Sequence, residues 1–323
     1  MAHKRKPAEI AAVLNRHLER LIPVLTPSGV FMGFLFPQVF IGLRPLVSLL
    51  FAVMTLSGAL KLRARELGMA LRHPLPIVLF FFSSHVLLPA AVLFISGIFF
   101  AGDADTISGY ILLYAAPTAV SGFIWVSIYR GDSALALAVI LLDTLAAPVV
   151  VPGTVSLLLG TKVALDMTGI AVSIIMMVVI PTIIGVTVNE VSRGKAPPLV
   201  VPYLNPVAKI CIILVIAANA SAIAPQVHPE DPKVWAIGAL CIGLSAIGYF
   251  LSKLVCVLGR LNPEKGVSIF FAVGLRNISA ATTIAIEFFP EAAALPAILG
   301  IVFQQTMAAV MGKLLIRPAG DPQ

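Results

Sequence analysis

Charged residues are scarce in this chain. They make up 11% of its 323 residues, whereas 59% of the residues are hydrophobic. Soluble domains carry about 25% charged residues, so the composition excludes an ordinary soluble domain and indicates a protein that crosses a membrane several times.

Cysteines and nucleotide-binding motifs are also scarce or absent. Cys211, Cys241 and Cys256 fall in or beside apolar segments, without metal-ligand or disulfide spacing, and we interpret them as small buried side chains. The sequence contains no G-x-x-x-x-G-K-[ST] motif. The loops, all short, contain no His-metal cluster and no nucleophile–base motif. We therefore expect no enzyme activity, no metal and no cofactor.

Long apolar runs dominate what is present. A helix of about 20 apolar residues can cross a bilayer. Ten such spans are predicted, at 21–40, 43–60, 76–100, 107–129, 133–158, 167–189, 204–224, 233–252, 266–288 and 293–314. The polar, basic segment 1–20 indicates no cleavable signal peptide and is compatible with a short surface helix. The predicted fold class is all-α, with ten transmembrane helices.

The loop charges predict the orientation of these spans. With the N-terminus in the cytoplasm, 17 of the 22 Lys and Arg residues fall in cytoplasmic segments, whereas Arg44, Lys162 and Lys233 fall outside. This bias follows the positive-inside rule. We predict that segment 1–20 and tail 315–323 are both cytoplasmic, in the plasma (inner) membrane. The net charge of +7 is explained by topology, and it gives no reason to expect nucleic-acid binding.

The loop 159–166 divides the chain into two groups of five spans. Because five is odd, a second group built like the first must have the opposite orientation. We therefore predict two inverted repeats, 21–158 and 167–314. Such repeats place a substrate site near the bilayer midplane, where interrupted helices from the two halves meet.

Two spans carry residues that interrupt helices, and they occupy equivalent places in the two halves. Pro117 lies in the fourth span and Gly274 in the ninth. Proline removes a backbone donor and glycine frees the backbone dihedrals. Unwound backbone at membrane depth must be buried in protein or line a cavity. The candidate substrate-path residues are Pro117, Thr118, Ser121, Gly122, Phe123, Gly274, Arg276, Asn277 and Ser279.

Three further polar residues inside spans are candidates for ion coupling: Ser84, His85 and Asp143. Ionisable groups at this depth usually face the bundle interior and mark a pathway. His85 is interpreted either as a packed neutral imidazole or as a proton-handling group. The hydroxyl of Ser84 fits an interhelical hydrogen bond as well as a substrate contact.

Two stretches resemble the bile acid–sodium symporter family, also called the solute carrier 10 fold. "APTAVSGFIWVSIYRGDSALALAVILLDTLAAPVVVP", 116–152, is similar to the family's Pro-Gly-Gly-Thr-Ala-Ser-Asn break, Arg-Gly loop and span ending in Leu-Ala-Pro. "FAVGLRNISAA" is similar to its Glu-Val-Gly-Met-Gln-Asn-Ser segment, and "SSHVLLP" more weakly to Ala-Gln-Phe-x-x-Met-Pro. The resemblance implies a panel domain, a core domain holding two crossing broken helices, and transport by alternating access.

The sodium ligands that this resemblance implies are missing from the chain. One cation site of the family uses four side-chain oxygens, whose positions here are Gly122, Phe123, Ala136 and Ile140. The acidic residue that bridges both sites falls on Ala272, and glutamines of the family fall on Arg276 and Ser84. Hard cations require several oxygen ligands. We therefore expect the usual sodium sites to be lost.

Arg276 has two interpretations, which do not exclude each other. It can stand in for bound sodium as a tethered cation and bind a carboxylate or sulfonate in bidentate geometry. Alternatively, it pairs with Asp143 and locks the core together. We expect Arg276 and Asp143 to approach each other, directly or through water. Protonation of Asp143, which burial favours, could then couple transport to a proton gradient.

The predicted function is secondary transport of an organic anion, either bile-acid-like or a small carboxylate such as pantoate or a keto acid. The expected partners are this anion and the lipid bilayer, with a proton rather than sodium as the coupling ion. A non-transporting receptor or channel is one alternative. Another is an arsenite exporter of the related superfamily, which needs a thiolate near the broken helix, whereas span 107–129 contains no cysteine.

Overall fold

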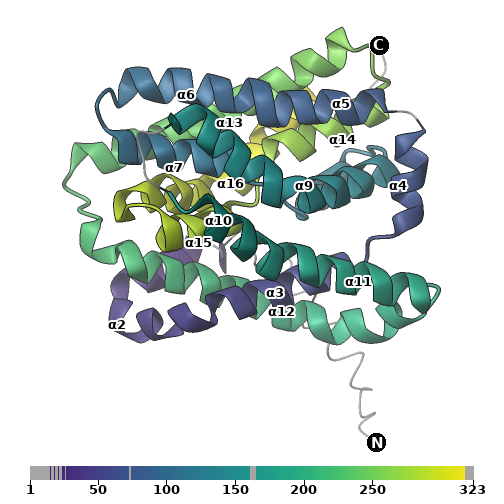
Figure 1. Cartoon of the computed structure of the whole chain (residues 1–323), viewed down its shortest axis with the longest axis horizontal. Helices are drawn as coiled ribbons and strands as arrows, with labels where there is room; N and C mark the ends of the chain where they lie inside the picture. Colours follow the sequence, from purple (N-terminus) through teal and green to yellow (C-terminus); the bar gives the residue numbers. More distant parts are fainter. Residues whose placement is uncertain are drawn as a thin grey trace, which may run out of the picture. The chain divides into compact units, whose positions relative to one another are not determined.

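The computed structural model describes residues 15, 18, 21, 24, 25, 27–72, 74–160 and 165–316. These residues form helices and no β-strand (Figure 1), in agreement with the predicted all-α class. Most of segment 1–20, where a surface helix is compatible with the sequence, lies outside the described residues. So do the centre of loop 159–166 and nearly all of tail 315–323.

Seven helices in the described part of the chain are long and apolar enough to cross a membrane. They are Pro37–Ala59, Leu75–Phe99, Ser133–Leu159, Met167–Val191, Ala196–Ile223, Pro232–Leu258 and Glu291–Leu315. Six of them overlap one predicted span each, and Pro37–Ala59 covers most of 43–60 and the end of 21–40. The largest shift is at the span predicted to begin at 204, which begins at Ala196, because Pro197 and Pro198 occupy its first turn. Proline is tolerated there, since the first backbone N–H groups of a helix have no partner within the helix.

The other three predicted spans are not single long helices. The fourth consists of α7 (Ala104–Ala115) and α8 (Gly122–Ile128), and the ninth consists of α14 (Pro263–Gly274) and α15 (Ile278–Phe288). The first predicted span, 21–40, is described only in part. Its helical residues 27–35 end at Phe36, where α2 (Pro37–Phe40) follows.

The chain forms two compact units that both draw on its two halves. One comprises residues 1–63 and 176–224, and the other comprises 64–175 and 225–323. Each unit combines a segment from the first half of the chain with a segment from the second half. These units therefore do not correspond to the two predicted repeats, which meet at loop 159–166. The inverted repeats 21–158 and 167–314 stay a prediction.

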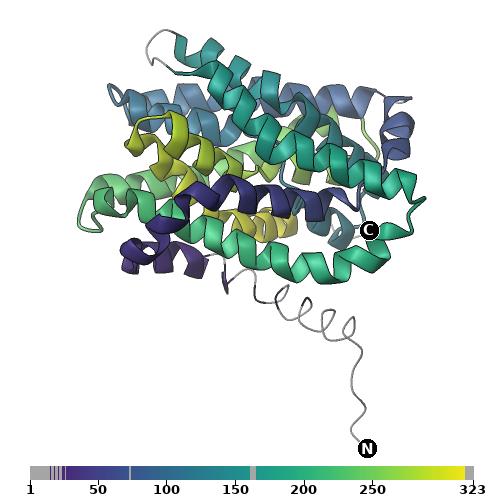
Figure 2. The same cartoon turned by 60° about the horizontal axis from the view of Figure 1, so that its bottom comes forward.

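The first unit is built on close helix packing. Its elements are α2, η1 (Ile41–Leu46), α3 (Val47–Ala59), α11 (Ile180–Val191) and α12 (Ala196–Ile223). Helix α3 lies alongside α11 and α12 (Figures 1 and 2). A methyl group at Gly185 would lie 2.7 Å from the Cβ of Ala59, so glycine permits this approach. Such contacts through small residues are typical of membrane helices.

The second unit contains the remaining helices and both interrupted spans. Besides α7, α8, α14 and α15, its elements are α4 (Ala64–Leu71), α5 (Leu75–Phe82), η2 (Ser83–Leu87), α6 (Leu88–Phe99), α9 (Ser133–Leu159), α10 (Met167–Ile174), η5 (Ala224–Gln226), α13 (Pro232–Leu258), η6 (Glu291–Ala293) and α16 (Ala294–Leu315), with η5 and η4 (Ile175–Val179) at the boundaries between the units. Helices α5 and α6 run as one long rod in Figure 1.

An aromatic cluster holds the end of α14 in place within the second unit. The ring centroids of Phe270 and Phe271 are 5.1 Å apart, and that of Tyr249, on α13, lies 4.9 Å from Phe270. All three side chains are fully buried. The chain therefore leaves α14 at Gly274 from a closely packed position.

Candidate functional site

Helix α7 ends where a proline follows. Ala116, directly before Pro117, has the extended backbone angles φ −54° and ψ 151°. The proline ring disfavours helical geometry in the preceding residue and provides no N–H for a helical hydrogen bond. The chain therefore unwinds over 116–121 before α8 begins.

Helix α14 ends for a different local reason. Gly274 lies against the ring of Tyr249, and a methyl group at this position would overlap that ring. The backbone then unwinds at Leu275, and α15 begins at Ile278 with Asn277 as its N-cap. The Asn277 side chain accepts a hydrogen bond from the N–H of Ala280, at 3.3 Å. This bond satisfies a helix-terminal donor.

The two unwound segments bond to each other. The N–H of Asn277 donates to the carbonyl of Pro117 at 2.7 Å, and the N–H of Ala119 donates to the carbonyl of Leu275 at 2.8 Å. Thr118 and Arg276 thereby form an antiparallel bridge. The backbone groups that the two breaks release from helices thus find partners, as a buried position requires.

Thr118 ties this bridge to the end of α14. Its hydroxyl donates to the carbonyl of Ala272 at 2.7 Å and lies 3.2 Å from the carbonyl of Leu275. Ala272 occupies a position where the family resemblance implies an acidic sodium ligand. Its backbone oxygen is thus already engaged by a side chain of the protein.

The side chain of Arg276 is buried among polar partners, with 2% of the residue exposed. Nη1 donates to the hydroxyl of Ser84, and Nη2 donates to the carbonyl of Ala116. The third donor group, Nε, has no acceptor in the described part of the protein. A buried guanidinium whose Nε–H is unused retains the capacity to bind a further acceptor.

Asp143, on α9, is completely buried and accepts two hydrogen bonds. One comes from the N–H of Thr118 at 2.6 Å, and the other from Nε2 of His85 at 2.8 Å. Because an ionised carboxylate only accepts, Nε2 carries a hydrogen in this arrangement. Nδ1 of His85 is buried without a partner among the described residues. His85 therefore binds Asp143 through one ring nitrogen and leaves the other without a hydrogen bond.

His85 lies in η2, a π-helical turn between α5 and α6. Single π-helical turns inside α-helices occur frequently at functional sites. The turn also contains Ser84, so neighbouring residues of one element contact Arg276 and Asp143. The rings of Phe80 and Phe81 lie beside the imidazole, at centroid distances of 6.1 and 5.5 Å.

A direct pair between Arg276 and Asp143, one of the two expected arrangements, is not formed. No hydrogen bond or ion pair links these side chains within the described residues, and the ion-pair partner of Asp143 is His85. The two charged groups are nevertheless near each other, because they bind backbone groups of residues two positions apart. They bind the carbonyl of Ala116 and the N–H of Thr118 respectively, so one unwound segment lies between them.

The structure thus brings together five of the predicted side chains: Ser84, His85, Thr118, Asp143 and Arg276. Pro117, Gly274 and Asn277 contribute backbone geometry and a cap, and Gly122 is buried at the start of α8. Three predicted residues form no hydrogen bond or ion pair with Arg276 or Asp143 within the described residues. Phe123 packs against the aromatic cluster, while Ser121 and Ser279 form no side-chain hydrogen bond in the described part of the chain.

Beside Arg276 there is a small cavity that the sequence did not predict. Its polar lining includes Tyr114, Ser245 and Gln304 as well as Arg276. Its volume of about 10 Å³ is close to the minimum that holds one water. The side-chain oxygen of Gln304 is buried there without a partner among the described residues. The position of Tyr114, two residues before the break at Ala116, was the available signal.

Comparisons with known proteins identify the family of this chain. The model of the sodium bile acid symporter family matches residues 48–228. The uncharacterized protein YbaS of Bacillus subtilis (strain 168) is 36% identical over 92% of this chain and 97% of its own length.

Two more distant relatives carry transport in their names. The probable sodium/metabolite cotransporter BASS3, chloroplastic, of Oryza sativa subsp. japonica is 24% identical over 82% of this chain and 64% of its own length. The uncharacterized sodium-dependent transporter YocS of Bacillus subtilis (strain 168) is 23% identical over 87% of this chain and 86% of its own length. The family match spans more than half of the chain and the similarity to YbaS nearly all of it, and the chain therefore belongs to the sodium bile acid symporter family.

Proposed function

We propose that the protein is a secondary transporter of an organic anion, in which Arg276 takes the electrostatic role of a bound sodium ion. The observation that carries this proposal is a buried guanidinium at the junction of two interrupted helices. A cation inside a membrane protein is costly and usually marks a functional path. Arg276 is also fixed in position by Ser84 and Ala116, as a substrate-binding group has to be.

An anion is the ligand that suits this cation. The unused Nε of Arg276 and the partnerless Gln304 oxygen belong to residues that line the same cavity. A carboxylate would accept a hydrogen bond from Nε of Arg276. If the amide group of Gln304 rotates, its N–H₂ could donate a second hydrogen bond to the same carboxylate. The cavity holds about one water in this conformation. Entry of an organic anion therefore requires it to widen, as in alternating access.

Sodium coupling is the inference that the names of BASS3 and YocS favour. Against it, Ala136, Ile140 and Ala272 are buried and provide no side-chain oxygen. Na⁺, like other hard cations, is held by several oxygen ligands. We therefore propose that transport does not depend on sodium at these positions.

The His85–Asp143 pair is the proposed site of proton coupling. Arg276 and the ionised Asp143 cancel each other in charge, and a neutral His85 adds none. An entering anion would leave this buried region with a net negative charge, which is costly in a low-dielectric interior. A proton taken up by His85 or Asp143 restores neutrality, so anion and proton would move together.

We also propose the ten-span topology, with both termini in the cytoplasm and the two halves as inverted repeats. The second compact unit would be the core domain and the first the panel domain. Ala101→Cys should react with an impermeant thiol reagent from outside, and Lys195→Cys from inside. The three native cysteines are buried and provide a low background. Labelling of both positions from the same side would contradict this topology.

Transport itself is tested with the purified protein in liposomes. Uptake of taurocholate, pantoate and pyruvate is measured with sodium or choline as the external cation, with and without an inward proton gradient. We expect uptake in choline that the proton gradient accelerates and that Arg276→Gln abolishes. Arg260→Gln, which removes an exposed loop charge, should transport normally.

Three outcomes would contradict the proposal or part of it. Uptake that requires sodium means that sodium ligands lie elsewhere in the chain. Flux that does not saturate and gives no counterflow indicates a channel. Binding without flux indicates a receptor.

A further inference from the structure

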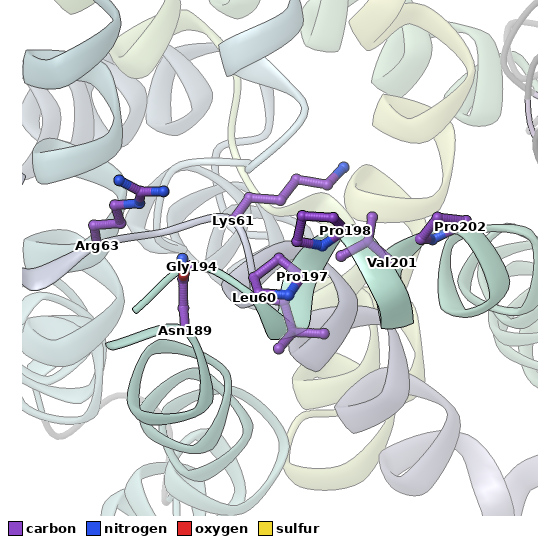
Figure 3. Close-up of a pocket in the computed structure, with 9 residues that line it drawn as sticks. All are labelled: Leu60, Lys61, Arg63, Asn189, Gly194, Pro197, Pro198, Val201 and Pro202. Carbon is purple, nitrogen blue, oxygen red and sulfur yellow. The ribbon is translucent and has the colours of Figure 1, made fainter. Parts of the chain in front are cut away.

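A second, larger pocket lies within the first compact unit, apart from the Arg276 site (Figure 3). Its volume is about 320 Å³. One wall is formed by residues 60–63, which follow α3, and the other by residues 189–202, where α11 ends and α12 begins. The loop charges predict that both segments face the cytoplasm.

Asn189 is the buried polar residue of this pocket. It is 3% exposed, and its Nδ2 donates to the carbonyl of Leu62 at 2.9 Å. Its Oδ1 has no donor in the described part of the protein. In Figure 3 the amide points toward Gly194, beneath the segment that carries Arg63. A buried acceptor without a donor is unfavourable, so a ligand that donates a hydrogen bond would be bound here.

The pocket is also basic. Its two wall segments contain Lys61, Arg63, Arg193 and Lys195 against a single acid, Glu190. Arg63 forms no hydrogen bond or ion pair with any described residue, and Figure 3 draws its guanidinium at the edge of the pocket. An anion could therefore use Arg63 without displacing a carboxylate from it.

A glycine in a left-handed conformation allows Arg63 to lie this close to the loop. Gly194 has φ +79°, and a Cβ at this position would lie 2.8 Å from Nη2 of Arg63. Any other residue at 194 would thus be strained in its backbone and would push the guanidinium away. A surface arginine without a function would not need a glycine at this position, so the close fit between Gly194 and Arg63 supports a role for Arg63.

From these features we infer that the pocket binds a phosphorylated polyol. The phosphate would contact Arg63, a hydroxyl would donate to Oδ1 of Asn189, and the carbon chain would lie against Pro197 and Pro198. Basic pockets on the cytoplasmic side of membrane helices commonly bind anionic headgroups. Arg63 is followed directly by Ala64, the first residue of the second unit. A ligand bound to Arg63 would therefore restrain the chain where it passes from the first unit to the second.

Two sources provide this chemistry, the headgroup of phosphatidylglycerol and a soluble compound such as glycerol 3-phosphate. The test measures the thermal unfolding of the purified full chain in neutral detergent. Short-chain phosphatidylglycerol, phosphatidylmethanol, phosphatidylcholine and glycerol 3-phosphate are titrated separately. Phosphatidylmethanol has the charge of phosphatidylglycerol but no hydroxyl, so the comparison isolates the contact with Asn189.

We expect phosphatidylglycerol to stabilise the protein more than phosphatidylmethanol, and phosphatidylcholine to have little effect. Arg63→Gln should weaken the apparent affinity for phosphatidylglycerol roughly fivefold, the effect of losing one basic contact. The matched control is Arg260→Gln, which removes an exposed arginine from another loop of the same predicted side and should change nothing. Asn189→Val should remove the preference over phosphatidylmethanol. If this variant does not fold, the comparison of the two lipids on the natural chain still decides.

The remaining outcomes identify the source or overturn the inference. Stabilisation by glycerol 3-phosphate that Arg63→Gln removes would assign the pocket to a soluble ligand, and stabilisation by the lipid alone would assign it to the membrane. Equal weakening by Arg63→Gln and Arg260→Gln would reduce the effect to general charge and overturn the site. So would equal binding of phosphatidylglycerol and phosphatidylcholine.

Discussion

Arg276 and Asp143 bind two backbone groups of the same unwound segment, on either side of Pro117. Arg276 donates to the carbonyl of Ala116, and Asp143 accepts from the N–H of Thr118 at 2.6 Å. A cation thus binds a free carbonyl and an anion binds a free N–H, which are the groups that the break at Pro117 releases. The two buried charges therefore stabilise the unwound backbone, and being of opposite sign they also stabilise each other.

Coupling between these two charges gives the first prediction. Arg276→Gln should lower stability by about 3–5 kcal/mol, because Asp143 is left as an uncompensated buried charge. Adding Asp143→Asn should recover part of this loss, with a coupling energy of about 0.5–3 kcal/mol. Thermal unfolding of the two single variants and the double variant measures it. Ser84→Ala, which removes one uncharged partner of Arg276, is the control. Strictly additive losses would mean that the charges act independently.

The second prediction concerns His85 and pH. The amide in His85→Gln can still donate a hydrogen bond to Asp143, but it cannot take up a proton between about pH 5 and 8, as an imidazole can. If the proposed coupling is right, it should retain anion counterflow while losing the acceleration of uptake by a proton gradient. His85→Leu should impair both, since Asp143 then lacks a donor. Proton-driven uptake that persists in His85→Gln would assign the coupling to Asp143 alone.

Packing at the second break gives the third prediction. Gly274→Ala should destabilise the protein by about 1–3 kcal/mol, because the new methyl group overlaps the ring of Tyr249. Gly243→Ala is the matched control on α13, where no atom lies within 4 Å of the added methyl group. It should be neutral or stabilising by up to about 1 kcal/mol, since alanine favours helix. Thermal midpoints of the two variants give the comparison, and equal losses would contradict it.

Asn277 separates a structural role from a substrate contact in the fourth prediction. Its side chain caps α15, so Asn277→Ala should cost about 0.5–2 kcal/mol of stability. Asn277→Asp keeps the capping oxygen but loses the amide donor. Reduced anion affinity in Asn277→Asp, at unchanged stability, would place the amide in the substrate path. If affinity stays the same, Asn277 is a cap only.

The fifth prediction concerns Asp103 in the loop before α7. Its partial burial would raise its pKa, but hydrogen bonds from Lys233, at 2.8 Å, and from Thr106 outweigh this and lower the pKa. A carboxyl whose pKa is lowered by folding adds stability above its unfolded pKa of about 3.9 and loses it as the pH falls through the folded value. The thermal midpoint of the natural chain should therefore fall more steeply below about pH 4 than that of Asp103→Asn, which keeps the cap.

The two helix breaks could be predicted because proline and glycine act on their own backbone. Pro117 needs no distant residue to end a helix, whereas the end of α14 at Gly274 also depends on packing against Tyr249 of α13. The long apolar helices could also be predicted from local sequence, because the length of an apolar segment is enough to identify them. The first predicted span was only partly testable, because it falls partly outside the described residues.

The partners of the buried charges could not be predicted in this way. Ser84 and Arg276 are 192 positions apart in the chain, and only the folded unit brings them together. Arg276 and Asp143 approach each other without the direct contact that was one of the two expected arrangements, because backbone groups, which were not counted as partners, bind both side chains. The carbonyl of Ala116 accepts a hydrogen bond from the guanidinium of Arg276. The N–H of Thr118 and the imidazole of His85 both donate to the carboxylate of Asp143.

The bridge between Thr118 and Arg276 also bears on how the protein is made. It joins residues 158 positions apart (276 − 118), so the first break is synthesised long before its partner. At about 5–20 residues per second, the delay is roughly 10–30 s. During this time the carbonyl of Pro117 and the N–H of Ala119 lack their final backbone partners. The interior of the second unit is therefore completed only when the ninth span arrives, and a chain that stops before it would leave these polar groups unpaired.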